Sequence, residues 1–206
     1  LPLRTEGLNN HIMRLYCEGC QYPQNTCICD HIDKVKTALD IIIVQHEKEA
    51  HHAKNTVRLL SLCMPSTQVV CASDNSAMAA LEMQCSHKHS ALIYPSETST
   101  PLENASATMS NQISTLILVD GSWKQAFGIV KRNPWLGGLP AFHFTNAPDS
   151  NYLIRHTSVA SALSTLEATA YAINCIENTN VLALHRAQSA LQKMWQGPQS
   201  HRRKVQ

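Results

Sequence analysis

The stretch Thr115-Leu116-Ile117-Leu118-Val119, followed by Asp120-Gly121-Ser122-Trp123, is the clearest indication of the fold. A short, continuous apolar run that stops at polar and turn-forming residues is typical of a buried strand. We expect a helix to follow and to run to about Asn133, because Pro134 disfavours helical backbone in the residue before it. The segment is therefore predicted to be a strand, a turn and a helix in direct succession.

Short apolar runs on both sides of this segment predict further strands, at residues 39–44, 68–72, 91–94 and 141–144. Between them, apolar residues at helical spacing predict helices at about 57–64, 78–83, 159–176 and 181–194. Residues 96–114 are rich in Ser, Thr and Asn and are expected to form a loop around a short helix. Strands that alternate with helices imply an α/β fold with helices on both faces of the sheet.

Length and composition limit the class of protein. The chain has 206 residues, which suits one full domain with a small appendage. Charged residues make up 16% of it, and the net charge of +2 is weak evidence for any partner. No apolar run approaches the roughly 18 residues of a membrane span, and no segment resembles a signal peptide. This composition predicts a cytoplasmic protein without a membrane segment.

Half of the eight cysteines lie within thirteen residues, in the pattern C-x2-C-x6-C-x-C formed by Cys17, Cys20, Cys27 and Cys29. Two close pairs of thiols joined by a short turn supply the four soft ligands of a structural zinc site. The alternatives are disulfides, scattered free thiols or a redox C-x-x-C, which is expected at the start of a helix after a strand. The segment between the pairs holds Gly19, Pro23 and Asn25, which are turn formers. We predict a structural zinc site.

The cysteine motif also suggests how the chain is divided. Residues 1–33 hold too little apolar side chain for a core of their own, so a metal ion is expected to hold this head together. Residues 34–200 are expected to form the main domain, and residues 201–206 a basic tail. Such a tail is compatible either with phosphate contacts or with a solvated end. The other cysteines lie in apolar segments and are expected in the core: Cys63, Cys71, Cys85 and Cys175.

Polar residues follow three of the predicted strands, at 45–47, 95–97 and 120–123. Ligands of open α/β sheets bind beyond the carboxyl ends of the strands, so these residues are candidates for a site. Asp120 is a candidate base in a partly dry pocket, although Asp or Ser before a helix is often only its N-cap. Trp123 is compatible with the core or with a lid over a purine ring. The chain has no P-loop and no G-x-G-x-x-G motif.

Residues 120–126, Asp-Gly-Ser-Trp-Lys-Gln-Ala, resemble the Asp-x-Thr/Ser-Trp signature of the DTW-domain proteins. Further motifs of that family match in order, from about Arg14 to Trp195: the four cysteines, Gln45-His46-Glu47 with Asn55-Thr56, Asn133-Pro134 with Leu139-Pro140, and residues 163–168. Two positions depart from the pattern. Ser122 stands where the family has Thr, and Glu47 stands where Pro is usual.

The resemblance implies a tRNA-uridine aminocarboxypropyltransferase. Such enzymes transfer the 3-amino-3-carboxypropyl group of S-adenosylmethionine (SAM) to N3 of a uridine in tRNA and release methylthioadenosine. The family is related to the SPOUT fold, so the resemblance also implies a carboxy-terminal trefoil knot around SAM. A SAM-dependent RNA methyltransferase and a non-catalytic zinc module that binds tRNA are the alternatives. Neither the target uridine nor the oligomeric state is indicated.

The resemblance also suggests roles for individual residues. Asp120 would accept or orient the N3 proton of uridine. Glu167 would hold the amino group of SAM, and Ser164 and Thr165 its carboxylate, although these residues also suit an ordinary helix N-terminus. The rest of the SAM site, with an adenine slot between the loops after Tyr94 and Val119, would include Tyr94, Pro95, Glu97, Leu118, Gly121, Ser122 and Trp123. Contacts to tRNA phosphates would come from Arg58, Lys124, Lys131, Arg132 and Arg155.

Overall fold

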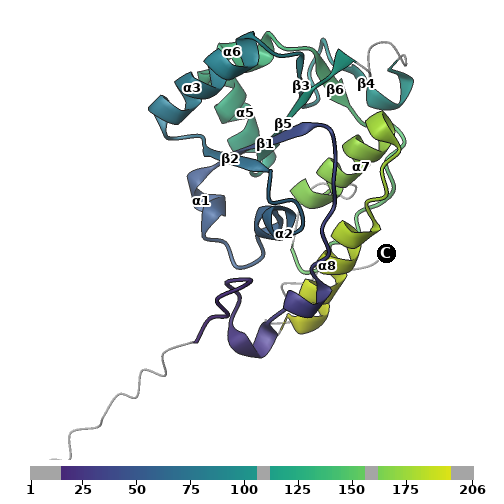
Figure 1. Ribbon diagram of the computed structural model, residues 1–206. Coiled ribbons are helices and arrows are strands. Elements are labelled where there is room, and N and C mark those ends of the chain that lie inside the picture. The colour runs from purple at the N-terminus through teal and green to yellow at the C-terminus, as the bar shows by residue number, and fades with distance from the viewer. Residues whose placement is uncertain (1–14, 106–111, 156–161, 196–206) are drawn as a thin grey trace, which may run out of the picture.

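The computed structural model describes residues 15–105, 112–155 and 162–195 (Figure 1). Within these residues six strands form one sheet in the order β2-β1-β5-β3-β6-β4, and every neighbouring pair is parallel. The strands are β1 (Asp40–Gln45), β2 (Gln68–Cys71), β3 (Ser90–Ile93), β4 (Thr100–Pro101), β5 (Thr115–Asp120) and β6 (Ala141–His143). The five predicted strands are confirmed. The two-residue strand β4 was missed, because it lies in a polar segment without an apolar run.

Strand β5 lies in the middle of the sheet, between β1 and β3. Its register pairs Asp120 with Gln45 on one side and Leu118 with Ile93 on the other. Because all the strands are parallel, the segments that follow β1, β3 and β5 leave the same edge of the sheet. The three polar clusters predicted from the sequence therefore follow three adjacent strands.

Helices cover both faces of the sheet, as predicted. Alternate strand residues point to opposite faces, so Ile41 and Ile43 belong to one apolar cluster and Ile42 and Val44 to another. The first cluster includes buried residues of α2 (Thr56–Cys63), α7 (Thr165–Glu177) and α8 (Leu182–Met194). The second includes those of α3 (Asn75–Ser86), α5 (Trp123–Arg132) and α6 (Pro134–Gly137). Figure 1 shows α3, α5 and α6 gathered on one side and α7 and α8 on the other.

Side-chain caps set the helix starts, and two predicted starts were wrong. The helix expected from Val159 begins at Thr165, because Ser164 caps it through a bond from the backbone N–H of Glu167. Residues 162–164 are not helical, and residues 159–161 lie outside the described residues. Helix α3 begins at Asn75 rather than at residue 78, because Asp74 accepts hydrogen bonds from two backbone N–H groups of its first turn.

The head is packed against the main domain rather than isolated from it. Its residues 15–33 contain two short 3-10 helices, Gln24–Thr26 and Cys29–His31. Three of its side chains are buried in the same apolar cluster as α2 and α8: Cys20, Tyr22 and Ile28. Figure 1 shows the head beside the end of α8. The expectation that metal alone would organise this head was therefore too narrow, because apolar packing on α2 and α8 also orders it.

Two expectations concern residues that the structure does not describe in full. The basic tail at 201–206 lies outside the described residues, and so do residues 156–161, on the path expected to form the knot. Within the described parts of the chain, no helix is long and apolar enough to cross a membrane.

Candidate functional site

Asp120 is the last residue of β5, and its side chain is bound by residues from two distant segments. The amide Nε2 of Gln45, at the end of β1, donates to Oδ2 of Asp120 at 2.9 Å. The hydroxyl of Thr165, at the start of α7, donates to Oδ1. Asp120 is only 4% exposed. The carboxylate is therefore fixed where the central strand, its neighbour and a helix N-terminus meet.

Burial raises the pKa of Asp120, because the charged form loses its water. The hydrogen bonds from Thr165 and Gln45 lower this pKa in part, since both favour the carboxylate. The negative charge of Glu49 raises it further, and the positive charge of Arg155 lowers it. The result is a carboxyl group that holds its proton to a higher pH than an exposed Asp, in a position fixed by two donors.

Asp120 is not the N-cap of the following helix. Ser122 caps α5, in a capping box with Gln125: the Ser122 hydroxyl accepts from the backbone N–H of Gln125, and the Gln125 side chain accepts from that of Ser122. The capping explanation therefore holds for Ser122 and does not apply to Asp120. A capping role cannot explain why a carboxylate is buried at this position.

The turn after Asp120 is too tight for a side chain at Gly121. A Cβ atom there would lie 3.0 Å from Cβ of Gln125 and 3.5 Å from Cβ of His46. The backbone N–H of His46 donates to the carbonyl of Asp120 at 2.9 Å, so this turn is tied to the end of β1. Glycine at this position avoids a close contact with Gln125, and the backbone bond from His46 holds the Asp120 turn against the end of β1.

A partly buried ion pair contributes to the electrostatic environment of Asp120. Glu49, in the short helix α1 (Glu47–Ala50), accepts from Arg155 at 2.7 Å. Glu49 is buried, and its charge acts on Asp120. Burial and the positive charge of Arg155 lower the pKa of His52 and of Lys54. Sequence reasoning missed Glu49, because nothing in the segment 47–50 distinguishes it from the exposed Glu47.

The four cysteine sulfurs of the head form the second candidate site. All four Sγ atoms lie within 4.8 Å of one another, and no disulfide joins the cysteines of the described residues. The Sγ–Sγ distance is 3.6 Å for Cys17–Cys29, 3.7 Å for Cys20–Cys27 and 3.5 Å for Cys17–Cys27. The edge of a tetrahedron with metal–sulfur bonds of about 2.3 Å is about 3.8 Å long. The cluster therefore fits a tetrahedral metal ion.

The backbone of the head favours this arrangement. The backbone N–H of Cys20, and then the Cys27 thiol, lower the pKa of the Cys17 thiol to about 6, so Cys17 ionises most readily. The thiols of Cys27 and Cys17, by contrast, raise the pKa of Cys29 to about 12. Gly19 leaves room for the sulfurs, since a Cβ there would lie 3.1 Å from Sγ of Cys29. Gln21 takes a left-handed conformation with φ of 59°, which turns the chain sharply after the first pair. Thiolates are the form that binds metal, so this loop is suited to be a ligand set.

The remaining cysteines only partly follow the sequence prediction. Cys63 and Cys85 are buried, and Cys175 is half-buried against the core. Cys71 is exposed, so the expectation that it belongs to the core was wrong. Its strand β2 is an edge strand whose residues Gln68, Val69 and Cys71 are all exposed.

Comparison with known families agrees with this geometry. The family model described as the DTW domain matches residues 14–199, which is most of the chain. The chain belongs to the DTW-domain family. Its Asp-Gly-Ser-Trp signature is therefore the turn that follows the central strand β5, and the four cysteines of the head lie within the matched region.

Curated relatives in animals share this domain. The chain is 27% identical over 172 residues to tRNA-uridine aminocarboxypropyltransferase 2 of Mus musculus, covering 81% of this chain and 58% of the relative. It is 26% identical to the protein of that name in Macaca fascicularis, with the same coverage. It is 30% identical over 169 residues to that of Drosophila melanogaster, covering 79% of this chain and 66% of the relative. No solved structure matches the chain.

The structure brings some predicted site residues of the DTW domain together. Tyr94, Pro95 and Glu97 follow β3, next to the signature turn after β5. Trp123 is 48% exposed, so it is not a core residue and its ring is accessible at this edge. The side chain of Leu118 belongs to the apolar core under the sheet. Leu118 therefore packs in the core next to the candidate site, and its side chain is not accessible to a ligand there.

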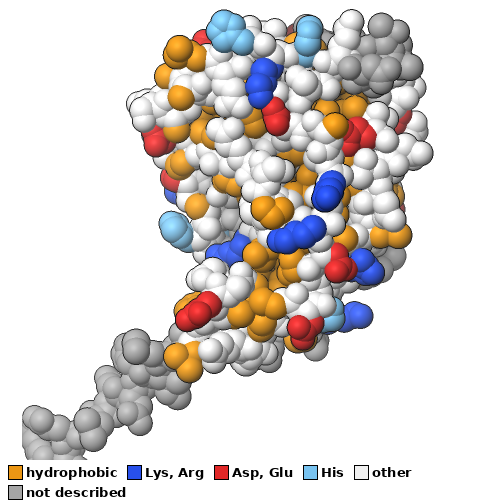
Figure 2. Space-filling model, in the orientation of Figure 1, with side chains coloured by type: hydrophobic (Ala, Val, Ile, Leu, Met, Phe, Trp, Pro, Cys, Tyr) orange, Lys and Arg blue, Asp and Glu red, His pale blue; other side chains and the backbone are white. Residues whose placement is uncertain are grey.

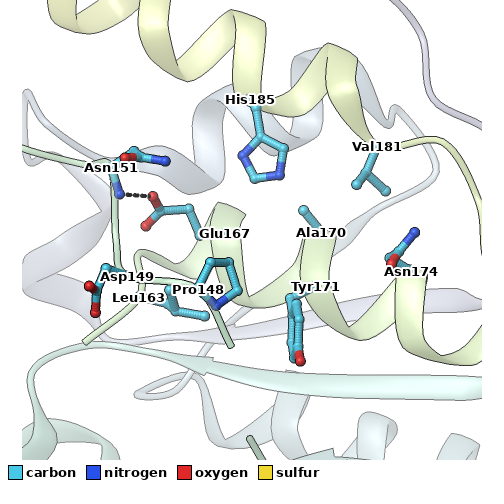
Figure 3. A pocket seen from close by; sticks show the side chains of 10 residues that line it. All are labelled: Pro148, Asp149, Asn151, Leu163, Glu167, Ala170, Tyr171, Asn174, Val181 and His185. Carbon is cyan, nitrogen blue, oxygen red and sulfur yellow. Dashed lines mark hydrogen bonds between the residues drawn. The ribbon is translucent and has the colours of Figure 1, made fainter. Parts of the chain in front are cut away.

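Glu167, by contrast, is fully engaged within the protein. Its carboxylate accepts from the backbone N–H groups of Ser164 and Asn151 and from the hydroxyl of Ser150, each at 2.8 Å. It thereby ties the loop before α7 to the start of that helix. Figure 3 shows Glu167 bound to Asn151 beside a cavity of about 130 Å³, with His185 and Tyr171 on its other sides. This cavity is smaller than the roughly 300 Å³ of typical ligand pockets.

Of the five residues predicted to contact RNA, two are bound to other parts of the protein and three are exposed. Arg58 packs over the ring of Tyr22 at 4.9 Å and donates to the carbonyl of Gln21 at 3.1 Å, so it joins α2 to the head. Arg155 is paired with Glu49. The other three residues are exposed on α5: Lys124, Lys131 and Arg132.

Proposed function

We propose that this protein is a tRNA-uridine aminocarboxypropyltransferase. It would transfer the 3-amino-3-carboxypropyl group of SAM to N3 of a uridine in tRNA. The observation that carries the proposal is the convergence at Asp120, where family motifs 75 and 45 residues away supply the two donors to its carboxylate. The names of the relatives support the same activity. The chain spans 58% of the length of the mouse and macaque relatives, so the activity of those whole proteins supports the proposal without deciding it.

The proposed chemistry requires a proton to leave N3 of uridine. A new bond forms between N3 and the terminal side-chain carbon of the aminocarboxypropyl group, the bond from that carbon to sulfur breaks, and methylthioadenosine leaves. Asp120 would accept the N3 proton or orient the base. Burial raises its pKa above that of an exposed Asp, which makes its carboxylate a stronger base. Gln45 and Thr165 would hold the carboxylate in one orientation.

SAM would bind at the carboxyl edge, between the loop after β3 and the signature turn. Tyr94, Pro95, Glu97 and the signature residues Gly121, Ser122 and Trp123 line this region. The start of α7, with Ser164 and Thr165, would receive the carboxylate of SAM, because the positive end of the helix dipole favours an anion there. Glu167 positions α7 through three accepted hydrogen bonds, and about one acceptor position of its carboxylate would be left for the amino group of SAM.

We further propose that the head binds one structural zinc ion and that the fold is SPOUT-like, with the trefoil knot implied by the family. The thiol geometry supports the zinc site. The position of Thr165 beside the end of β5 supports a chain that returns to the central strand after β6. An experimental structure that traces residues 144–164 would establish the path of the chain and hence the knot.

tRNA is the proposed partner, and the cytoplasm is the proposed location. Figure 2 shows Lys and Arg side chains over the middle and lower part of one face, around α2, α8 and the head, with acidic side chains among them. The exposed basic residues of α5 lie on the other side of the sheet from α2 and α8. A mixed surface of this kind supports contact with phosphates at several points rather than one continuous basic patch.

The test is transfer to unmodified tRNA with two samples of labelled SAM. In one the label is on the carboxyl carbon, and in the other it is on the methyl group. The proposal expects carboxyl label in the RNA, methyl label in the released methylthioadenosine, and a uridine that carries the added group by mass spectrometry. Methyl label in the RNA would identify a methyltransferase instead. Tight tRNA binding without SAM binding by calorimetry would identify a non-catalytic module.

A further inference from the structure

The outer face of α5 carries two large aromatic side chains one helical turn apart. Phe127 is 60% exposed and Trp123 is 48% exposed, whereas Ala126 and Ile129 of the same helix are buried against the sheet. Residues four apart lie on one face of a helix, so Trp123, Phe127 and Lys131 form one stripe. The stripe begins within the signature turn itself and leads away from Asp120.

The charges on helix α5 itself have one sign. No Asp or Glu stands in the sequence between Asp120 and Asp149, while Lys124, Lys131 and Arg132 all lie on α5. The ammonium of Lys131 lies 6.0 Å from the centroid of the Phe127 ring. An exposed aromatic ring with cations beside it and no acid in its helix complements a ligand that combines flat rings with negative charge.

We propose that Phe127, with Lys131 and Lys124, forms a stacking platform for an unpaired nucleotide that neighbours the target uridine. The proposal rests on the proposed function, since it names the part of the RNA substrate that this surface receives. Aromatic side chains in a basic setting are how proteins hold single-stranded bases without reading their sequence. Unpaired loops of RNA present such unstacked bases, whereas the bases of a duplex are stacked and closed to an aromatic ring.

The position of Phe127 fits a base close to the reacting one. Phe127 lies four residues after Trp123, which corresponds to about 6 Å along a helix axis. A nucleotide held there would be near the nucleotide whose uridine reaches Asp120. A second copy of the chain is a less suitable occupant, because a symmetric contact through α5 would place Lys124, Lys131 and Arg132 against their own counterparts.

The experiment measures the affinity of an unmodified tRNA transcript for the full chain and for the variant Phe127→Ala. Loss of one stacked base is expected to weaken binding about 5- to 150-fold. Phe127→Tyr keeps a ring and should bind within about twofold of the wild type, since a phenol stacks as a phenyl does. Met83→Ala is the matched control, because Met83 is an apolar residue of a different helix, α3, and is 69% exposed. The affinity for SAM should be unchanged in all three variants.

A Phe127→Ala variant that binds the transcript as tightly as the wild type would overturn the platform. So would a variant that binds the transcript normally but changes from dimer to monomer in sedimentation, because a second copy would then be the occupant. These results can be separated from failure of the proposed function. A wild type that binds the transcript but forms no modified uridine refutes the transferase and leaves the affinity comparison valid.

Discussion

The two candidate sites of this protein are built in opposite ways. The head collects four thiols from one stretch of thirteen residues, Cys17 to Cys29. The edge of the sheet collects Gln45, Asp120 and Thr165, which are 75 and 45 residues apart along the chain. A ligand set that is local in sequence can be recognised by its spacing alone. A set that only the fold assembles can be recognised only one segment at a time.

The two sites also differ in how they depend on the rest of the molecule. The sulfurs of the head are held by a turn whose own backbone bonds shape it, such as the bond from the N–H of Cys17 to the carbonyl of Tyr22 at 2.8 Å. Asp120 is held by the sheet register, the start of α7 and the surrounding burial. Substitutions in the head should therefore lower the stability of the fold, and substitutions at the edge of the sheet should lower the rate of transfer. The predictions below test this division.

The largest effect is expected when the metal site is destroyed. We expect about one zinc ion per purified chain, by the four-ligand argument. Cys20→Ser should lose this metal and unfold the head, because structural zinc supplies about 10–16 kcal/mol to small sites and Cys20 is also buried in the core. Metal analysis and thermal unfolding are the measurements, and chelation of the wild type should lower its melting temperature in the same way.

Cys71→Ser is the matched control, because Cys71 is an exposed thiol outside the cluster. It should leave the zinc content and the melting temperature unchanged. Protein purified without metal and with the head cysteines in disulfides would show that the spacing was misinterpreted. The head would then be a redox element and not a metal site.

The second effect concerns the edge of the sheet. Asp120→Asn should reduce transfer about 10²- to 10⁴-fold while SAM affinity stays mostly intact, since it removes a charge or a base and keeps the shape. Asp74→Asn is the control, because Asp74 is an exposed Asp that caps α3 and Asn caps a helix almost as well. Activity on unmodified tRNA and calorimetry with SAM are the measurements. Near-normal turnover in Asp120→Asn would leave bulk solvent as the proton acceptor.

The sequence was sufficient for the parts of the fold that depend on local pattern. The apolar run 115–119 predicted a buried strand, because a strand buried on both faces leaves no place for polar residues. The alternation of strands and helices predicted the α/β class. Strand β4 and the start of α7 were not predictable in this way. A two-residue strand carries no period, and the apolar spacing begins at Val159, before the true start of α7, which the capping box of Ser164 and Glu167 sets.

The site was predictable as a set of positions but not as a set of bonds. The polar residues after β1 and β5 were expected at one edge, and the structure joins Gln45 to Asp120 there. Thr165 was assigned to SAM, and its hydroxyl instead donates to Asp120 in this structure. Glu49 and Arg155 affect the pKa of Asp120 through their charges, and no motif in the sequence indicated that pair. Contacts of this kind depend on tertiary packing, which spacing does not encode.

A third prediction follows from the raised pKa of Asp120. Because burial is its main cause, the folded chain binds this proton more tightly than the unfolded chain. The stability that this carboxyl contributes is present below the ordinary Asp pKa of about 3.9 and is lost as the pH rises through the raised value. Wild type should thus gain stability relative to Asp120→Asn on acidification.

The raised pKa of Asp120 should also determine how the rate of transfer depends on pH. If the carboxylate is the active form, kcat/KM should fall about tenfold per pH unit below the raised pKa, and this acid limb should lie above pH 3.9. Urea unfolding at several pH values and a pH–rate profile are the measurements. An acid limb at the value of an exposed Asp would show that burial does not control this group in solution.

The smallest expected effect tests whether Thr165 positions Asp120 or only stabilises the helix. Thr165→Val removes the donor to Oδ1, and since that bond lowers the pKa of Asp120, the acid limb should move to higher pH. Thr169→Val is the control in the same helix. Thr169 is buried, and its hydroxyl also donates a hydrogen bond, at 2.7 Å, but to the backbone carbonyl of Thr165. Both variants should lose about 0.5–3 kcal/mol of stability. Only Thr165→Val should change the pH profile, and Thr165→Ser, which keeps the hydroxyl, should restore it. Equal profiles in the two valine variants would reduce Thr165 to a structural residue and leave Gln45 as the only side chain that orients Asp120.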